Sequence, residues 1–413
     1  MRIGVFFFGA VEFEGPLGVD GPAPLDRRVT PGQVWRATER LLDVGATADH
    51  LGYDAFWLTE HHFQHEGYEV IPNGLLLGAF LAARTRRISI GTMFNVVAQW
   101  HPLRLAEDFA TLHNLSGGRA VLGVGRGTVP REMLPLSFGR TSVGSSDNPD
   151  QAAADALNRE VTEEGIDLLL TALRQERFCH RGRHFQAPPA GIPDRGGEVR
   201  DLTLLPSPRF PFDVWQPTTS PATLAAVARR DTGAVFWLQH EDLLRRGWET
   251  YQQHWEQAHG SVLAPGARRM LVVNTHIADS HEQAVAQARP GHDEFWKFLG
   301  PYGWGRGYRS ADGAPMPAGW VPTLADSMAQ RTWVVGTAQE VAAGLAALRD
   351  ALDLQDLTIF PSMPGESYDV AEEQLERFAA EVRPLLDPPG RPRSAGSAEP
   401  APALLARQPV GAS

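Results

Sequence analysis

Cysteine and lysine are almost absent from this chain of 413 residues. Cys179 is the only cysteine, so a single chain cannot hold an internal disulfide, a cysteine-rich zinc module or an iron–sulfur cluster. Lys297 is the only lysine, and a Schiff-base enzyme would have to use it. The lysine of the motif Gly-x-x-x-x-Gly-Lys is missing, which excludes a P-loop nucleotide-binding protein.

Positive charge and long apolar runs are also scarce. The 49 acidic residues exceed the 38 basic ones, which gives a formal net charge of −11. This balance argues against a nucleic-acid partner and against binding to an anionic membrane surface. No apolar run approaches the roughly 20 residues of a transmembrane helix, and the apolar start of the chain is too short for a secretory signal. We therefore expect a cytoplasmic protein.

Short apolar runs alternate with longer amphipathic segments along most of the chain. The runs with the character of buried strands lie at 2–8, 54–59, 87–97, 119–124, 212–216, 234–238, 270–277 and 357–360. Strands that alternate with helices form parallel sheets, and eight such units predict a (β/α)8 TIM barrel of the α/β class. A doubly wound sheet is the alternative, but the first run is not followed by Gly-x-Gly-x-x-Gly.

Three stretches fall outside this pattern. Segment 177–210 contains Arg181-Gly182, a turn signal that predicts a β-hairpin. A helix is expected over 280–288, and the aromatic-rich segment 290–331 after it is expected to be an insertion near the C-terminal units that acts as an ordered lid. Residues 388–413 are rich in Ala, Pro, Ser and Gly and predict a disordered tail. One barrel domain is therefore expected over 1–387.

Three titratable residues follow the second predicted strand, where a barrel opens onto its active-site face. Side chains alternate along an extended segment, so Glu60 and His62 should share one side while His61 faces the other. A histidine in this place suits acid–base chemistry near neutral pH. The ordinary alternative is a histidine pair that only orders the loop. No metal site is expected, because His61 and His65 lie on no clear helix and the motif His-Glu-x-x-His is absent.

Two further motifs stand at predicted strand ends. Gly125-Arg126-Gly127 follows the fourth strand, where glycines admit a flat ligand or a phosphate and the arginine offers a fork of donors. Thr218-Thr219-Ser220 precedes a helix, whose free N–H groups and neighbouring hydroxyls form an anion site. An ordinary surface turn and an ordinary helix cap are the alternatives for these two motifs.

Taken in order, these motifs resemble the bacterial luciferase-like, flavin-dependent monooxygenases. The resemblance rests on Trp57-Leu58-Thr59-Glu60-His61-His62-Phe63, Gly91-Thr92-Met93-Phe94, His101-Pro102-Leu103-Arg104 with Glu107-Asp108, Gly118-Arg119, Gly125-Arg126-Gly127, Val335-Gly336-Thr337 and Leu357-Thr358-Ile359-Phe360-Pro361. It covers roughly residues 1–385 and is looser beyond Gly127. It implies a (β/α)8 barrel that uses reduced FMN or, in some branches, the deazaflavin F420.

The resemblance also implies roles for individual residues. The catalytic histidine beside the flavin ring is His61, within the motif that also contains Glu60 and His62. The flavin phosphate is bound by Arg126, with help from Thr218, Thr219 and Ser220. The Met93–Phe94 peptide is cis in family members and lies against the flavin, as does Gly125. Because Gly125 replaces the reactive cysteine of the luciferase subunit, aldehyde-specific light emission is a poor expectation.

Four residues are expected to contact the substrate. His101 and Glu132 lie in strings that border the cavity in family members, while Trp304 and Tyr308 belong to the aromatic insertion that could cover a large apolar molecule. Plain packing of the insertion onto the barrel is the alternative for the two aromatic residues.

The implied activity is a two-component FMN-dependent monooxygenase. Reduced FMN and O2 would oxygenate a bulky, largely apolar substrate, such as a natural-product intermediate, through a C4a-(hydro)peroxyflavin. A separate NAD(P)H:flavin reductase is expected as a partner, because no second nucleotide-binding fingerprint is present. A homodimer is expected from the family. An F420-dependent dehydrogenase on the same barrel and a non-catalytic flavin-binding relative are the alternatives.

Overall fold

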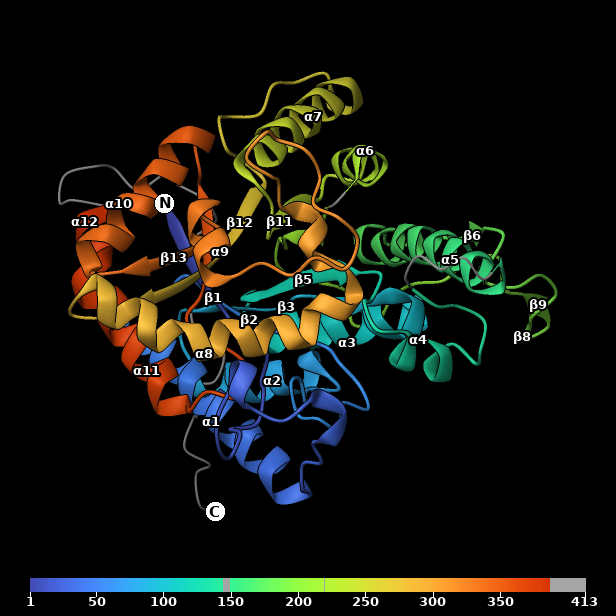
Figure 1. Ribbon diagram of the computed structural model, residues 1–413. Helices are drawn as coiled ribbons and strands as arrows, with labels where there is room; N and C mark the ends of the chain where they lie inside the picture. The colour runs from blue at the N-terminus through green and yellow to red at the C-terminus, as the bar shows by residue number, and fades with distance from the viewer. Residues whose placement is uncertain (144–148, 219, 387–413) are drawn as a thin grey trace, which may run out of the picture.

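Eight parallel strands close into a barrel (Figure 1). The computed structural model describes residues 1–143, 149–218 and 220–386, so the tail predicted at 388–413 lies outside the described residues. The barrel strands are β1 (Arg2–Phe6), β2 (Ala55–Leu58), β3 (Ser89–Thr92), β5 (Ala120–Gly125), β10 (Val214–Pro217), β11 (Gly233–Trp237), β12 (Arg269–Ile277) and β14 (Asp356–Phe360). Each of these strands pairs with the next one in this order. The last strand, β14, pairs with β1 and closes the barrel, and Gly4 lies opposite Thr358 in this pair. The predicted TIM barrel is confirmed.

Helices follow the strands and cover the outside of the barrel. They are α1 (Pro31–His50), α2 (Gly74–Arg84), α3 (Pro102–Leu115), α5 (Pro149–Arg174), α6 (Pro221–Arg229), α7 (Glu241–His259), α10 (Ala338–Leu352) and α11 (Tyr368–Arg377), which continues through a π-helical turn into α12 (Arg383–Leu386). Local sequence fixes several of their starts. Thr30 with Gln33 and Thr337 with Glu340 form capping boxes, in which each side chain satisfies a free backbone N–H of the first turn.

Large aromatic side chains fill the inside of the barrel. The rings of Trp57 and Trp215 fit only because the neighbouring strands carry glycine beside them. A Cβ atom on Gly91 would lie 2.3 Å from the Trp57 ring, and one on Gly233 would lie 2.4 Å from the Trp215 ring. Because the interior is packed, a ligand site must lie at the mouth formed by the carboxyl ends of the strands.

Helix α8 (His281–Leu299) lies across this mouth (Figure 1). Its Phe295 ring stacks on Phe8 with centroids 6.0 Å apart and lies 6.2 Å from the ring of Phe360. The helix is longer than the one predicted over 280–288, because it continues through Pro290 instead of ending before it. The irregular insertion therefore begins only after Leu299.

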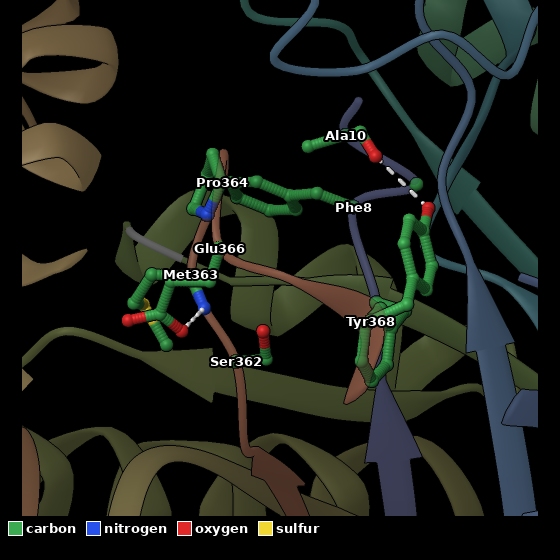
Figure 2. Close-up of a pocket in the computed structure, with 9 residues that line it drawn as sticks. Phe8, Ala10, Ser362, Met363, Pro364, Glu366 and Tyr368 are labelled. Atoms are coloured by element: carbon green, nitrogen blue, oxygen red, sulfur yellow. Dashed lines mark hydrogen bonds between the residues drawn. The ribbon is translucent and has the colours of Figure 1, made fainter. Parts of the chain in front are cut away.

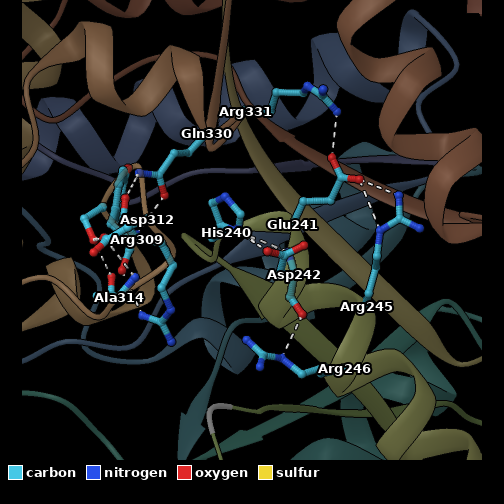
Figure 3. Close-up of polar contacts among 12 residues, drawn as sticks. His240, Glu241, Asp242, Arg245, Arg246, Arg309, Asp312, Ala314, Gln330 and Arg331 are labelled. Carbon is cyan, nitrogen blue, oxygen red and sulfur yellow. Dashed lines mark hydrogen bonds and ion pairs between the residues drawn. The ribbon is translucent and has the colours of Figure 1, made fainter.

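The segment after α8 is anchored to the neighbouring barrel helix. It contains the short helix α9 (Leu324–Ala329) and the strand β13 (Trp333–Gly336), which pairs with the end of β12. Figure 3 shows Arg331 reaching Glu241 at the start of α7, with Nη1 2.7 Å from Oε2. Gln330 exchanges two hydrogen bonds with the backbone of Arg309, of 2.7 and 3.1 Å. The segment is thus held as ordered structure, and its opening or closing as a lid stays a prediction.

Two small hairpins extend from the barrel between α5 and β10. The predicted hairpin is confirmed: β6 (His180–Arg181) pairs antiparallel with β7 (Gln186–Ala187). A carboxylate of α5 orders its turn, because Glu164 accepts the backbone N–H groups of Arg183, His184 and Phe185. The second hairpin joins β8 (Pro193–Asp194) and β9 (Gly197–Glu198). Across all described residues, no helix is both long and apolar enough to cross a membrane.

Candidate active site

The motif Glu60-His61-His62 stands at the barrel mouth, just after β2. Its side chains diverge as the alternation of an extended segment predicts. His62 Nε2 lies 3.6 Å from Glu60 Oε1, whereas the ring of His61 faces other carboxylates. The Glu60 carboxylate is buried and accepts the indole N–H of Trp100 at 2.9 and 3.0 Å. Glu60 therefore orders the loop before α3 as well as facing His62.

His61 is held between two buried carboxylates. Its Nδ1 lies 3.0 Å from Glu132 Oε1, and its Nε2 lies 2.9 Å from Glu69 Oε2. Burial by itself would lower the pKa of His61, but the two carboxylates outweigh it and raise that pKa well above the ordinary value. His61 is therefore an imidazolium whose Nδ1–H is donated to Glu132 and whose Nε2 faces the Glu69 carboxylate as an ion pair. In this geometry it is a fixed positive charge, and neither nitrogen is free to act as a base.

The two carboxylates differ in their own surroundings. Burial raises the pKa of Glu69 to about 7, although His61 opposes the shift. Burial also acts on Glu132, but His61 outweighs it and lowers the pKa of Glu132. Glu132 has a further donor in Gln64, whose Nε2 lies 2.8 Å from Oε1. The less stabilised negative charge of the pair is therefore on Glu69.

Three members of this cluster were not expected from the sequence. Glu69 and Gln64 lie in the irregular loop after His62, and Arg131 immediately precedes Glu132 on the short helix α4 (Pro130–Leu136). Arg131 binds the Glu66 carboxylate at 2.7 Å. The density of polar residues in 60–69 was the available signal, but an irregular loop has no periodicity from which side-chain directions can be predicted.

The Met93–Phe94 peptide is cis, as the resemblance to the flavin-dependent family implies. It packs closely on β5 because that strand carries glycine at the points of contact. A Cβ atom on Gly123 would lie 1.9 Å from the carbonyl oxygen of Thr92, and one on Gly125 would lie 2.8 Å from Phe94 Cβ. Gly125 thus serves the packing of this loop at the mouth.

Each described residue of the predicted phosphate site has a partner within the protein. Arg126 follows β5 and pairs with Asp155 of α5, with Nη1 2.7 Å from Oδ1, while about a third of its side chain stays exposed. Ser220 caps α6 by accepting the N–H of Thr223, as the alternative interpretation of its motif, an ordinary helix cap, predicts. Thr218 is buried and donates its hydroxyl to the carbonyl of Val235. Thr219 lies outside the described residues.

The predicted substrate residues fall into different environments. His101 is exposed and caps α3 through the N–H of Leu103. Trp304 reaches the mouth, where its ring meets that of Trp237 with centroids 5.4 Å apart. Tyr308 was expected to cover a substrate, but its side chain is fully buried. Its hydroxyl forms hydrogen bonds with the hydroxyls of Ser327 and Thr332, at 3.0 and 2.5 Å. Glu132 contacts His61 and so belongs to the charged cluster.

Several buried polar atoms near this motif have no hydrogen-bond partner. Among the described residues they include His62 Nε2, Gln64 Oε1, Glu66 Oε2 and Glu69 Oε2 after β2, and Asn95 Oδ1 and Gln99 Oε1 between β3 and α3. Leaving such atoms unsatisfied costs about 1–3 kcal/mol each, so a polar ligand that reaches them is favoured. The polar ring edge of a flavin fits this requirement, and the exposed part of Arg126 fits its phosphate. Among the described residues, no group of His, Cys, Asp and Glu is arranged to hold a metal ion.

A small cavity lies beside the ends of β1 and β14 (Figure 2). Glu366 turns toward the backbone there, and its Oε2 accepts the N–H of Met363 at 2.7 Å. Burial raises the pKa of Glu366 to about 7. The Tyr368 hydroxyl donates to the carbonyl of Ala10 at 2.9 Å. This cavity contains none of the residues predicted from the sequence.

A closed (β/α)8 barrel with a histidine–carboxylate cluster and an arginine at its mouth defines the class of TIM-barrel enzymes that bind their ligand at the strand ends. The particular family follows from sequence comparison. The chain belongs to the luciferase-like monooxygenase family, whose sequence profile matches residues 1–355.

Three relatives show the range of this family. The chain is 26% identical over 364 residues to 3,6-diketocamphane 1,6-monooxygenase of Pseudomonas putida, covering 83% of this chain and 92% of that protein. It is 40% identical over 159 residues to an F420-dependent glucose-6-phosphate dehydrogenase of Microbacterium testaceum, covering 38% and 43%. The crystal structure of the oxygenating constituent of 3,6-diketocamphane monooxygenase from P. putida, in complex with FMN, matches with a TM-score of 0.69 at 20% identity, over 93% and 98% of the two chains.

Proposed function

We propose that this protein is an FMN-dependent monooxygenase that uses reduced FMN and O2 to oxygenate a bulky, largely apolar organic substrate. The observation that carries the proposal is the likeness to 3,6-diketocamphane 1,6-monooxygenase, which extends over 83% of the chain. The likeness to the F420-dependent relative spans only 38%. A natural-product intermediate is one substrate of the proposed kind.

Reduced flavin supplies the reaction with O2, and the protein supplies binding, orientation and exclusion of water. His61 would place a fixed positive charge beside the flavin ring, because both of its nitrogens are held by carboxylates. Such a preorganised charge stabilises negative charge that develops next to it. Trp237 and Trp304 offer an aromatic wall on which an apolar substrate would lie. The anchored segment 300–332 would shield that wall from water.

Replacement of Arg126 by methionine should weaken FMN binding by about 10- to 100-fold, because a charge-assisted contact to the phosphate is lost. Riboflavin lacks the phosphate, so its affinity should stay the same. Fluorescence titration of both flavins measures the difference. Arg159→Met is the matched control, since Arg159 also contacts Asp155 but is more exposed. Equal losses for FMN and riboflavin would contradict a phosphate role for Arg126.

An F420-dependent dehydrogenase is the second candidate, favoured by the 40% identity to the glucose-6-phosphate enzyme over 159 residues. It predicts anaerobic hydride transfer with F420 and no tight binding of FMN. Parallel titrations with FMN, reduced FMN and F420 separate the two candidates. A non-catalytic flavin-binding protein would bind FMN but form no product. Because the monooxygenase needs reduced flavin, we also propose a separate NAD(P)H:flavin reductase as its partner.

We further propose that two copies of the chain associate through α2 and α3. These helices pack together, and they expose Leu76, Phe80 and Leu115 by 70%, 62% and 67%. Burial of such side chains contributes about 1.5–3 kcal/mol each. Phe80→Glu should therefore convert a dimer into a monomer in sedimentation experiments, whereas Leu25→Glu, an exposed apolar site elsewhere, should leave it unchanged. A wild-type protein that sediments as a monomer would contradict this interface.

A further inference from the structure

The loop after β2 and the helix α4 bring together more negative than positive charge. Three carboxylates meet there, those of Glu66, Glu69 and Glu132, and each is less than a tenth exposed. Two cations face them, His61 and Arg131. With every group ionised, the cluster carries one uncompensated negative charge. An unpaired buried charge is costly, so the cluster favours the uptake of one proton.

The contacts decide which carboxylate takes this proton. Glu66 has a guanidinium partner, since Arg131 Nη2 lies 2.7 Å from its Oε1. Glu132 faces His61 and also accepts the amide of Gln64. Glu69 is 2% exposed and, among the described residues, contacts no cation other than His61. The excess negative charge is therefore least compensated on Glu69.

The other described groups around Glu69 form no ion pair with it. The phenol of Tyr302 faces the cluster from the segment after α8, and burial raises its pKa, which keeps it neutral. His65 accepts from Arg131, whose Nη1 lies 3.2 Å from Nδ1 and can only donate. His62 lies on the other side of the chain, where it faces the buried carboxylate of Glu60, and its charge acts on Glu132 and not directly on Glu69.

We propose that Glu69 is the residue of this site that takes up and releases a proton, while His61 remains an imidazolium. The burial that raises the pKa of Glu69 to about 7 agrees with this assignment. The carbonyl oxygen of a neutral Glu69 can still accept the Nε2–H of His61, so its protonation changes the charge of the site without releasing the histidine. The five groups together are neutral while Glu69 holds the proton and carry one negative charge after it is released.

A consequence concerns the binding of an anionic flavin, and this consequence rests on the proposed function. A negative ligand beside the cluster is repelled by ionised Glu69, so its binding should raise the pKa of Glu69 and draw in a proton. One additional charge at roughly 8–10 Å weakens binding by about threefold to tenfold at effective dielectric constants of about 30–50, between the value of a protein surface and that of water. FMN should therefore bind less tightly above pH 7 than below it.

The test of Glu69 itself uses the full chain without ligand. Infrared difference spectra from about pH 6 to about pH 8.5 should show carboxyl groups losing their protons in the wild type. Burial raises the pKa of both Glu69 and Glu366 to about 7, so both carboxyl groups contribute to this signal. Glu69→Gln should remove the contribution of Glu69, and the control Glu366→Gln should remove only that of Glu366. Nitrogen NMR of the histidine rings, assigned with His61→Gln, should show His61 doubly protonated throughout. An unchanged spectrum in Glu69→Gln, or a His61 that titrates in this range, would overturn the proposal.

Titration with FMN tests the consequence separately. In the wild type and in Glu366→Gln, the Kd for FMN should rise between about pH 6 and about pH 8.5. This rise should be about threefold to tenfold larger than the rise in Glu69→Gln. The comparison with Glu69→Gln removes the titration of the FMN phosphate itself. The same pH dependence in all three proteins would overturn the coupling. No binding of FMN at any pH would instead contradict the proposed function, while the infrared result would still decide the role of Glu69.

Discussion

Replacement of His61 by glutamine is expected to lower the rate of oxygenation by about 100- to 1,000-fold, the usual loss when one preorganised stabilising group is removed. Glutamine can donate to one carboxylate but carries no charge. It would leave Glu69 and Glu132, both close to the His61 ring, without the cation between them. One of the two should then take up a proton, because each buried carboxylate disfavours ionisation of the other once the cation is gone.

The measurement is product formation with reduced FMN and O2 over a panel of apolar cyclic ketones, chosen by likeness to the diketocamphane enzyme. FMN affinity is measured in parallel, so that a loss of chemistry is distinguished from a loss of binding. His50→Gln serves as the control, because His50 is an exposed residue in the last turn of α1. A His61→Gln protein that keeps most of the wild-type rate would exclude His61 from the catalytic site.

Replacement of Glu294 by alanine is expected to destabilise the protein by about 3–5 kcal/mol, the usual cost of removing one partner from a buried ion pair. Glu294 lies on α8 and is fully buried. Its carboxylate pairs with Arg27, accepts the hydroxyl of Tyr68 at 2.6 Å and accepts the backbone N–H of Gly18 at 2.9 Å. The cluster thus ties the loop after β1 and the loop after β2 to the helix that crosses the mouth. Without the carboxylate, the Arg27 guanidinium would be buried and unpaired.

Chemical denaturation measures this loss, with Glu282→Ala as the control because Glu282 lies exposed on the same helix. The effect should also depend on pH. Burial alone would raise the pKa of Glu294, but Arg27, Tyr68 and Gly18 outweigh it and hold that pKa below its ordinary value. The carboxylate therefore contributes its full stability above the ordinary glutamate range, and the contribution falls as the pH drops through the folded-state pKa. A difference between Glu294→Ala and the wild type that stays constant at acidic pH would contradict this account.

The barrel could be predicted from sequence because its signal is repeated. Eight apolar runs alternate with amphipathic segments, and each repetition reinforces the same topology. The opposite directions of His61 and His62 were also predictable, since an extended segment has a fixed period of two. Both predictions depend only on local geometry and on the order of elements along the chain.

The extent of α8 could not be predicted from local rules. A proline inside a helix costs about 3 kcal/mol, which predicts an end near Pro290. The structure shows the residues beyond it, Phe295 and Trp296, buried against the barrel mouth. Each such side chain contributes about 1.5–3 kcal/mol on burial, so tertiary packing outweighs the penalty. This packing is long-range and leaves no local signal.

The charged cluster was predictable only in part for the same reason. His61 was a candidate because it belongs to a recognisable motif, and Glu132 because its segment borders the cavity in family members. Glu69 belongs to none, and its contact with His61 depends on the path of an irregular loop. Tyr308 shows the converse: the aromatic composition of its segment predicted a substrate contact, but its hydroxyl is satisfied within the core by Ser327 and Thr332.

The transfer of labelled oxygen from O2 to an organic product tests the central claim most directly. The purified protein is supplied with chemically reduced FMN, labelled O2 and the panel of apolar ketones, and the products are analysed by mass spectrometry. The account predicts one labelled oxygen atom in the product with reduced FMN, and no product when O2 is removed. Turnover that needs F420 and proceeds without O2, with no labelled product under any condition, would contradict it.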